Sequence, residues 1–182
     1  MTAAKSGKRS SGIWSIVFIS VISAFLLMTI IQGQEAYAER KKVSGTGKAV
    51  STVSETKIVP GDLPKHTLTF SSRIDMQESP NPDFVGQVIA HHVSDYTAGT
   101  GRHWGYRMTT HSSGDKAIMA LEGMTKTVAK PKAFPDISFE GKWRYTGGTG
   151  RFKGIKGSGT YTGKVTKAGL TYDWEGEYEI KP

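Results

Sequence analysis

Residues 170–180 read Leu-Thr-Tyr-Asp-Trp-Glu-Gly-Glu-Tyr-Glu-Ile, and this stretch decides the fold class. Every second position from Leu170 to Ile180 carries an aromatic, aliphatic or glycine residue, whereas four of the five positions between them carry a carboxylate. Successive side chains of a β-strand point to opposite faces of the sheet. The stretch therefore predicts an antiparallel strand with a buried aromatic face and a solvent-exposed acidic face.

Two further stretches repeat this alternation. Residues 137–146 alternate apolar positions with charged or hydroxyl residues, and residues 102–110 alternate large apolar side chains with His103, Arg107 and Thr109. We expect the aromatic faces to point into a common interior. The residues predicted to line it are Trp104, Tyr106, Met108, Ile137, Phe139, Trp143, Tyr145, Phe152, Tyr172, Trp174 and Tyr178.

Turn residues divide the chain after Val43 into eight strand-like segments, with no stretch of helical periodicity between them. The segments span residues 48–59, 66–76, 84–97, 102–112, 116–127, 137–146, 151–163 and 169–180. Most connections are short, so sequential neighbours are expected to pair antiparallel. We predict an all-β fold, a single antiparallel up-and-down β-barrel of about eight strands. A two-sheet sandwich would satisfy the same alternation but would leave exposed edge strands.

The first 38 residues have the composition of a targeting segment. Three basic residues precede an uncharged, mostly apolar run of 19 residues from Ile13 to Ile31, and Ala36-Tyr37-Ala38 follows. This order is typical of a secretory signal peptide, and we predict cleavage after Ala38. An uncleaved membrane anchor is the alternative, because the run approaches the roughly 20 residues that span a bilayer. Either way we expect residues 39–182 to form one domain outside the cytoplasm, secreted or periplasmic after cleavage.

Composition excludes several function classes. The 182 residues include no cysteine, which excludes disulfide bonds, thiolate nucleophiles and cysteine-ligated metals. The first 38 residues hold three Lys or Arg and one Glu, which leaves 21 basic and 15 acidic residues in the rest, a formal charge of +6. These charges are interspersed and form no recognition motif, so we expect no nucleic-acid partner.

The glycine-rich segment 147–163, GGTGRFKGIKGSGTYTG, carries neither a G-x-G-x-x-G nor a P-loop pattern, and no helix is predicted after it. It therefore does not favour a phosphate-binding loop. We expect Gly154, Gly157 and Gly159 to allow sharp coiling of a strand and to leave room for aromatic neighbours such as Trp143 and Trp174.

The run Glu140-Gly141-Lys142-Trp143-Arg144-Tyr145 followed by GGTGRFKGIKGSGTY resembles the signature of the allene oxide cyclase-like barrels. This superfamily of small eight-stranded β-barrels includes the plant allene oxide cyclases and the dirigent proteins. The stretch GRHWGYRMTTHSSGDKAIMALEG is similar to the preceding hairpin of exported bacterial members, which have no assigned activity. The resemblance covers most of residues 66–180, and its specific motif spans residues 140–161. It implies a barrel that confines an apolar substrate, and it brings no catalytic residues with it.

An aromatic interior supports three hypotheses about function. The first is binding of an apolar small molecule. The second is an isomerase or cyclase of the allene oxide cyclase type that confines its substrate, with Glu122 or a tyrosine as its polar group. The third is a non-catalytic surface or assembly protein, because the interior of an eight-stranded barrel can be filled completely by side chains. Whether the protein is an enzyme stays open.

Glu122 and the histidines are the remaining polar candidates. Glu122 lies in a strand with two apolar faces. Pointing inward, it could act as a general acid or base. Pointing outward, the position we favour because buried unpaired acids are rare, it is a surface carboxylate. His91 and His92 point to opposite faces, and His103 and His111 share the face opposite the aromatic one, which predicts that both point outward. We expect no metal site and no cofactor.

Overall fold

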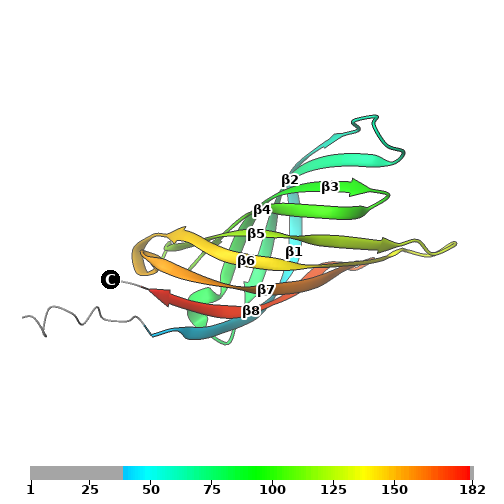
Figure 1. Ribbon diagram of the computed structural model, residues 1–182. Coiled ribbons are helices and arrows are strands. Elements are labelled where there is room, and N and C mark those ends of the chain that lie inside the picture. The colour runs from blue at the N-terminus through cyan, green and yellow to red at the C-terminus, as the bar shows by residue number, and fades with distance from the viewer. Residues whose placement is uncertain (1–38, 181–182) are drawn as a thin grey trace, which may run out of the picture. The chain divides into compact units, whose positions relative to one another are not determined.

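The computed structural model describes residues 39–180, and the predicted targeting segment, residues 1–38, lies outside the described residues. The described chain forms eight strands and two short 3-10 helices (Figure 1). The strands are β1 (Lys41–Ile58), β2 (His66–Glu78), β3 (Gly86–Thr97), β4 (Thr100–Thr110), β5 (Lys116–Val128), β6 (Asp136–Gly148), β7 (Ile155–Thr166) and β8 (Gly169–Ile180). The 3-10 helices are η1 (Pro82–Phe84) and η2 (Gly150–Phe152). No helix among these residues is long and apolar enough to cross a membrane.

Each strand pairs antiparallel with the next one in sequence, and β8 pairs with β1, which closes the sheet into a barrel. This confirms the predicted up-and-down barrel and excludes the sandwich. The β3–β4 and β7–β8 connections have two residues each, and in the first, Ala98-Gly99, φ is positive at both residues (52° and 82°), as two-residue hairpins favour. The predicted strand bounds lie within three residues of those in the structure except at two starts. β1 begins earlier, at Lys41, and β7 begins later, at Ile155, because η2 precedes it.

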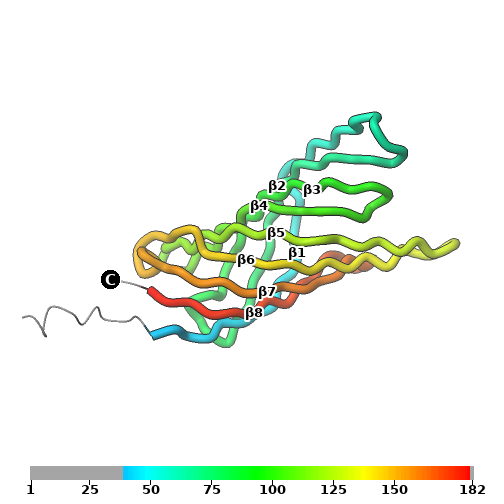
Figure 2. The backbone as a smooth tube through the Cα atoms, viewed as in Figure 1, coloured from blue at the N-terminus to red at the C-terminus, as the bar shows by residue number. Residues whose placement is uncertain are grey.

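β1 has different neighbours along its length. Residues 41–48 pair with β8, whereas the rest of the strand pairs with β2 alone. Register shifts between Ala49 and Ser51 and between Thr52 and Ser54 bend the strand where the two partners diverge. The second part of β1 therefore separates from β8 and continues with β2 as the projecting hairpin that Figure 2 shows beside β3. We call the end of the barrel with the β3–β4 and β5–β6 connections the open end. The opposite end, with η1 and η2, is the packed end.

Aromatic side chains fill the packed end. Phe84 of η1 points into the barrel, where its ring centroid lies 4.9 Å from that of Tyr178 and 5.5 Å from that of Phe152 in η2. Trp143 and Trp174 extend the cluster, with centroids 6.0 Å apart. All five side chains are buried, and aromatic contacts of this kind stabilise beyond the area they bury. The two 3-10 helices thus close one end of the barrel with phenylalanine side chains.

Glycines make room for the two tryptophans. A Cβ atom built on Gly159 or on Gly176 would lie 2.6 Å from Cζ2 of Trp143. A Cβ atom on Gly45 would lie 2.7 Å from Nε1 of Trp174, and all three distances are too short for a real side chain. The expected role of Gly159 is confirmed. Gly154 has a different role, because it lies in the turn before β7 with a left-handed φ of 78°.

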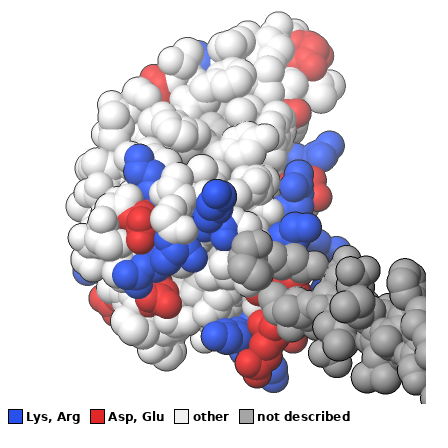
Figure 3. Space-filling model, turned by 90° about the vertical axis from the view of Figure 1, so that its left-hand side faces the viewer, with Lys and Arg blue, Asp and Glu red and all other residues white. Residues whose placement is uncertain are grey.

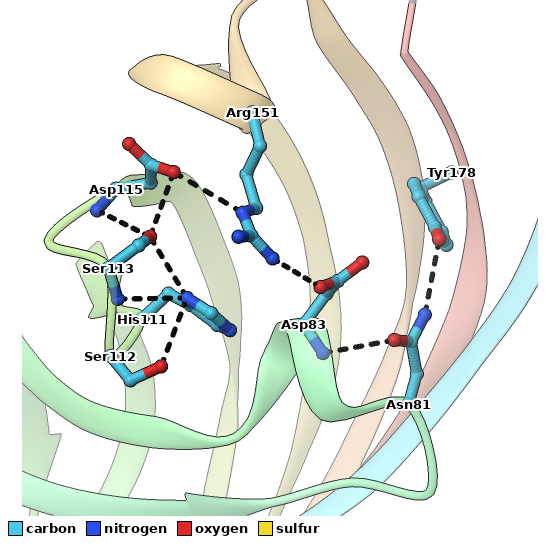
Figure 4. A network of polar contacts seen from close by, with 8 residues as sticks. All are labelled: Asn81, Asp83, His111, Ser112, Ser113, Asp115, Arg151 and Tyr178. Carbon is cyan, nitrogen blue, oxygen red and sulfur yellow. Dashed lines mark hydrogen bonds and ion pairs between the residues drawn. The ribbon is translucent and has the colours of Figure 1, made fainter.

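A polar network connects the loops of the packed end (Figure 4). Arg151 donates from Nη1 to Asp83 Oδ1 at 2.7 Å and from Nε to Asp115 Oδ2 at 3.3 Å, so one side chain of η2 links η1 and the β4–β5 turn. Asn81 accepts a hydrogen bond from the N–H of Asp83 at 3.0 Å and donates to the Tyr178 hydroxyl at 3.1 Å. Figure 3 looks onto this end, where basic and acidic side chains lie interspersed. The network fixes the two helices whose phenylalanines close the barrel.

Candidate ligand-binding cavity

The open half of the barrel holds a cavity of about 330 Å³. Seven strands contribute to its wall, and β1 does not. Its apolar side chains are Leu121, Ile137, Phe139, Val165 and Leu170, and its larger polar side chains are Arg73, His92, Tyr96, His103, Arg107, Tyr161 and Tyr172. A second hollow, bordered by Glu55, Lys57 and Lys65, shares four wall residues with the cavity and continues it at the open end. The interior is therefore solid at one end and hollow at the other.

An ion-pair network lies at the inner end of the cavity. Asp75 is fully buried, and its Oδ1 accepts from Arg73 Nε at 2.6 Å. Its Oδ2 accepts from Arg73 Nη2 and from Arg107 Nη2, each at 3.1 Å. Arg107 Nη2 also donates to the Tyr172 hydroxyl, and the guanidinium carbon lies 4.1 Å from the centre of that ring. Both oxygens of this buried carboxylate thus accept hydrogen bonds from guanidinium groups.

A chain of hydrogen bonds crosses the cavity wall from β3 to β7. His103 Nε2 lies 2.6 Å from the Tyr161 hydroxyl, and His103 Nδ1 lies 3.0 Å from Thr125 Oγ1. Thr125 Oγ1 in turn lies 2.7 Å from the Tyr96 hydroxyl. The Tyr161 hydroxyl fits here because two neighbouring residues are glycines: a Cβ atom on Gly123 would lie 2.5 Å from it, and a Cβ atom on Gly141 would also clash with it. The two glycines thus leave space for the Tyr161 side chain on the inner face of the sheet.

Burial sets the protonation of these groups. It lowers the pKa of His103 to about 4, with a smaller contribution from the charge of Arg73. It lowers the pKa of His92 well below the usual value, and the charges of Arg73 and Arg107 act in the same direction. Burial raises the pKa of Tyr161. At neutral pH both imidazoles are therefore uncharged, and Tyr161 is a protonated phenol.

Most of the predicted interior residues point inward. Phe139 and Tyr172 line the cavity, as does Ile137. The others, Trp143, Tyr145, Phe152, Trp174 and Tyr178, are buried and belong to the aromatic core rather than to the cavity wall.

The predicted orientation of β4 is wrong. Trp104 and Tyr106 are 38% and 58% exposed and lie on the outer face with Met108, whereas His103 and Arg107 are buried. The alternation along β4 was predicted correctly, but the face predicted to point into the barrel points outward and the other face points inward. The physical reason is that the inward polar groups are compensated: Arg107 pairs with Asp75, and His103 is hydrogen-bonded through both ring nitrogens.

Glu122 is exposed on the outer face of β5, the outward of the two positions that the sequence left open. His91 and His92 point to opposite faces as predicted, with His91 exposed and His92 on the cavity wall. Sequence reasoning missed the inward positions of Arg73, Asp75 and Tyr161. One signal was present: Arg73 and Asp75 are oppositely charged and two residues apart, so they share a strand face.

Within the described range, 39–180, no group of three or more histidine, aspartate or glutamate side chains is arranged to hold a metal ion. No protein-family model matches the chain, and no curated protein matches it.

Proposed function

We propose that the barrel binds an apolar small molecule in the cavity of its open half. The observation that carries this proposal is the division of the interior: aromatic packing ends near Trp143 and Trp174, and beyond it the apolar side chains of Phe139, Leu121 and Val165 face empty volume. A volume of about 330 Å³ is at the small end of the range of ligand sites, which are lined mainly by apolar groups with a few polar ones.

Export is part of the proposal. Residues 1–38 carry the signal-peptide pattern, and the barrel lacks cysteine, so it needs no disulfide chemistry outside the cytoplasm. The resemblance to exported allene oxide cyclase-like barrels supports the same location. N-terminal sequencing of the exported protein should give a start at Glu39, and an intact N-terminus would favour the anchor instead.

A binding titration tests the cavity. N-phenyl-1-naphthylamine fluoresces strongly only in apolar surroundings, so we expect saturable, one-to-one enhancement with the purified protein. Val165→Trp, which places an indole at the cavity wall, should weaken binding at least tenfold. Val128→Trp is the matched control, because Val128 is 48% exposed and does not line the cavity. Absence of saturable binding, or equal binding by Val165→Trp, would contradict the proposal.

A second candidate function is an isomerase that acts on the molecule held in the cavity. The observation that favours it is the Tyr161–His103 pair, because a neutral imidazole 2.6 Å from a phenol can exchange a proton with it beside a bound ligand. Tyr161 therefore takes the acid–base role considered for Glu122, which lies outside the cavity. Conversion of a β,γ-unsaturated ketone to its conjugated isomer, abolished in Tyr161→Phe while probe binding persists, would support it. No conversion by the wild-type protein would remove it.

A further inference from the structure

The inner end of the cavity carries a net positive charge. Arg73 and Arg107 are the charged side chains on the cavity wall, and the single carboxylate of Asp75 lies behind them and is shared by both. His92 and His103 are the other titratable nitrogen bases on the wall, and burial keeps both uncharged at neutral pH. Two guanidinium groups and one carboxylate leave one positive charge uncompensated.

Hydrogen-bond donors remain unused at the same place. Every hydrogen bond that Arg107 makes with residues 39–180 comes from Nη2, and those of Arg73 come from Nε and Nη2. The Nη1 groups of both arginines therefore lack partners in the described part of the chain. Arg107 Nε and His92 Nε2 are also buried without a partner. Buried polar groups are normally hydrogen-bonded, so the unpaired N–H groups of the two arginines beside a cavity indicate a site for an acceptor.

Three of the five apolar side chains on the wall lie toward the other end of the cavity. Ile137, Val165 and Leu170 are each the second residue from a strand end at the open end of the barrel. Arg73 and Arg107 lie seven residues inside β2 and β4, next to buried Ala90 of β3. The cationic groups therefore lie inside the cavity, and apolar side chains are present at its mouth.

From this arrangement we infer that the ligand is an apolar carboxylate, bound with its carboxylate against Arg73 and Arg107 and its apolar body against Phe139 and the rim. The inference rests on the proposed binding function and specifies the class of ligand. Guanidinium groups suit this role because they are always charged and present paired donors to a planar carboxylate. Lys57 and Lys65, which outnumber Glu55 around the adjoining hollow, would favour approach of an anion.

Matched probes test the head group. 2-Naphthoate and 2-naphthamide share one ring system and differ in charge, and both can be titrated by fluorescence at neutral pH and constant ionic strength. We expect the wild-type protein to bind 2-naphthoate at least tenfold more tightly than the amide. Arg73→Gln should reduce this preference to about threefold or less, because a carboxylate loses more than a neutral amide when one of the two guanidinium groups is removed. Asp75 keeps its hydrogen bond from Arg107 in this variant.

The control variant is Arg102→Gln, since Arg102 is exposed on the outer face of β4 and should keep the wild-type preference. Equal binding of the two probes by the wild-type protein would overturn the inference and leave the proposed cavity function intact. A full preference retained in Arg73→Gln, with its circular dichroism unchanged, would also overturn it. If N-phenyl-1-naphthylamine and both naphthyl probes fail to bind, the proposed function itself fails.

Discussion

Asp75 and Arg107 lie 32 positions apart in the sequence and form a buried ion pair inside the barrel, with 3.1 Å between Asp75 Oδ2 and Arg107 Nη2. Asp75 has no exposed surface, and Arg73 holds its other oxygen. The pair joins β2 to β4 over the inner face of β3, and Arg107 lies at the inner end of the cavity. Asp75 is therefore the carboxylate that pairs with both arginines of the cavity wall.

Removing that carboxylate should be costly. Asp75→Leu leaves two guanidinium groups in the barrel without a counter-charge, and we expect the free energy of unfolding to fall by about 3–5 kcal/mol. Asp173→Leu, at an exposed position of β8, should change it by less than about 1 kcal/mol. Urea denaturation of the two variants and the wild-type protein measures the difference. Equal midpoints would show that the ion-pair network does not support the fold.

The role of glycine in leaving room for the Trp143 side chain can also be tested. Gly159→Ala places a methyl group 2.6 Å from the indole and against the backbone carbonyl of Glu175, and we expect a loss of at least about 1–3 kcal/mol in the free energy of unfolding from overpacking. Gly147→Ala is the matched control on β6, because a Cβ atom there meets nothing within 4 Å. Thermal unfolding followed by circular dichroism compares them. A Gly159→Ala protein as stable as the control would disprove the packing argument.

Stability should fall as the pH drops from about 6.5 toward about 4, in part through His103. The unfolded chain binds a proton near the ordinary histidine pKa of 6.5, whereas burial holds the folded pKa near 4, so acid favours the unfolded state in this window. His92 acts in the same direction. His66 acts oppositely, because Asp62 and Asp95 raise its pKa.

Comparing variants isolates the contribution of His103, since His66 and His92 are unchanged in each. Denaturant midpoints measured across this pH range should vary less in His103→Gln than in the wild-type protein. The reason is that unfolding of the wild-type protein takes up as much as one additional proton, the one that binds to His103. His91→Gln changes an exposed histidine of β3 and should keep the wild-type profile. Identical profiles for all three proteins would refute the account of His103.

The orientation of β4 can be checked in solution. Trp104 is 38% exposed, whereas Trp143 and Trp174 are 3% and 5% exposed. Iodide should therefore quench the wild-type fluorescence in part, and Trp104→Phe should lose more of the quenchable signal than Trp174→Phe. Trp14 lies outside the described residues and is the same in both variants, so it does not affect the comparison. A larger loss in Trp174→Phe would reverse the assignment of the faces.

The strands and their order were predictable from the sequence because alternation and short turns are local signals. In β8 the acidic and aromatic faces differ so strongly that the buried face is unambiguous, and Tyr172, Trp174 and Tyr178 are indeed buried. The same pattern also fits a sandwich, and closure into a barrel was favoured because it leaves no exposed edge strand.

The site was not predictable, because its partners come from distant strands. In β4 one face carries Trp104 and Tyr106 and the other His103 and Arg107, and hydrophobicity alone selects the wrong face. What reverses the choice is Asp75 on β2 and Tyr161 on β7, whose proximity arises only from the closed barrel. Ion pairs and hydrogen bonds between distant strands produce no periodic pattern in the sequence, so the alternation of residues could not reveal them.

The most direct test of the account is a crystal structure of the protein with N-phenyl-1-naphthylamine. We predict density for one probe molecule inside the open half of the barrel, in contact with Phe139 and Leu121, while Trp143 and Trp174 keep the packed end closed. Density confined to the outer groove beside Trp104 and Tyr106, or an open half filled by its own side chains, would contradict the central claim.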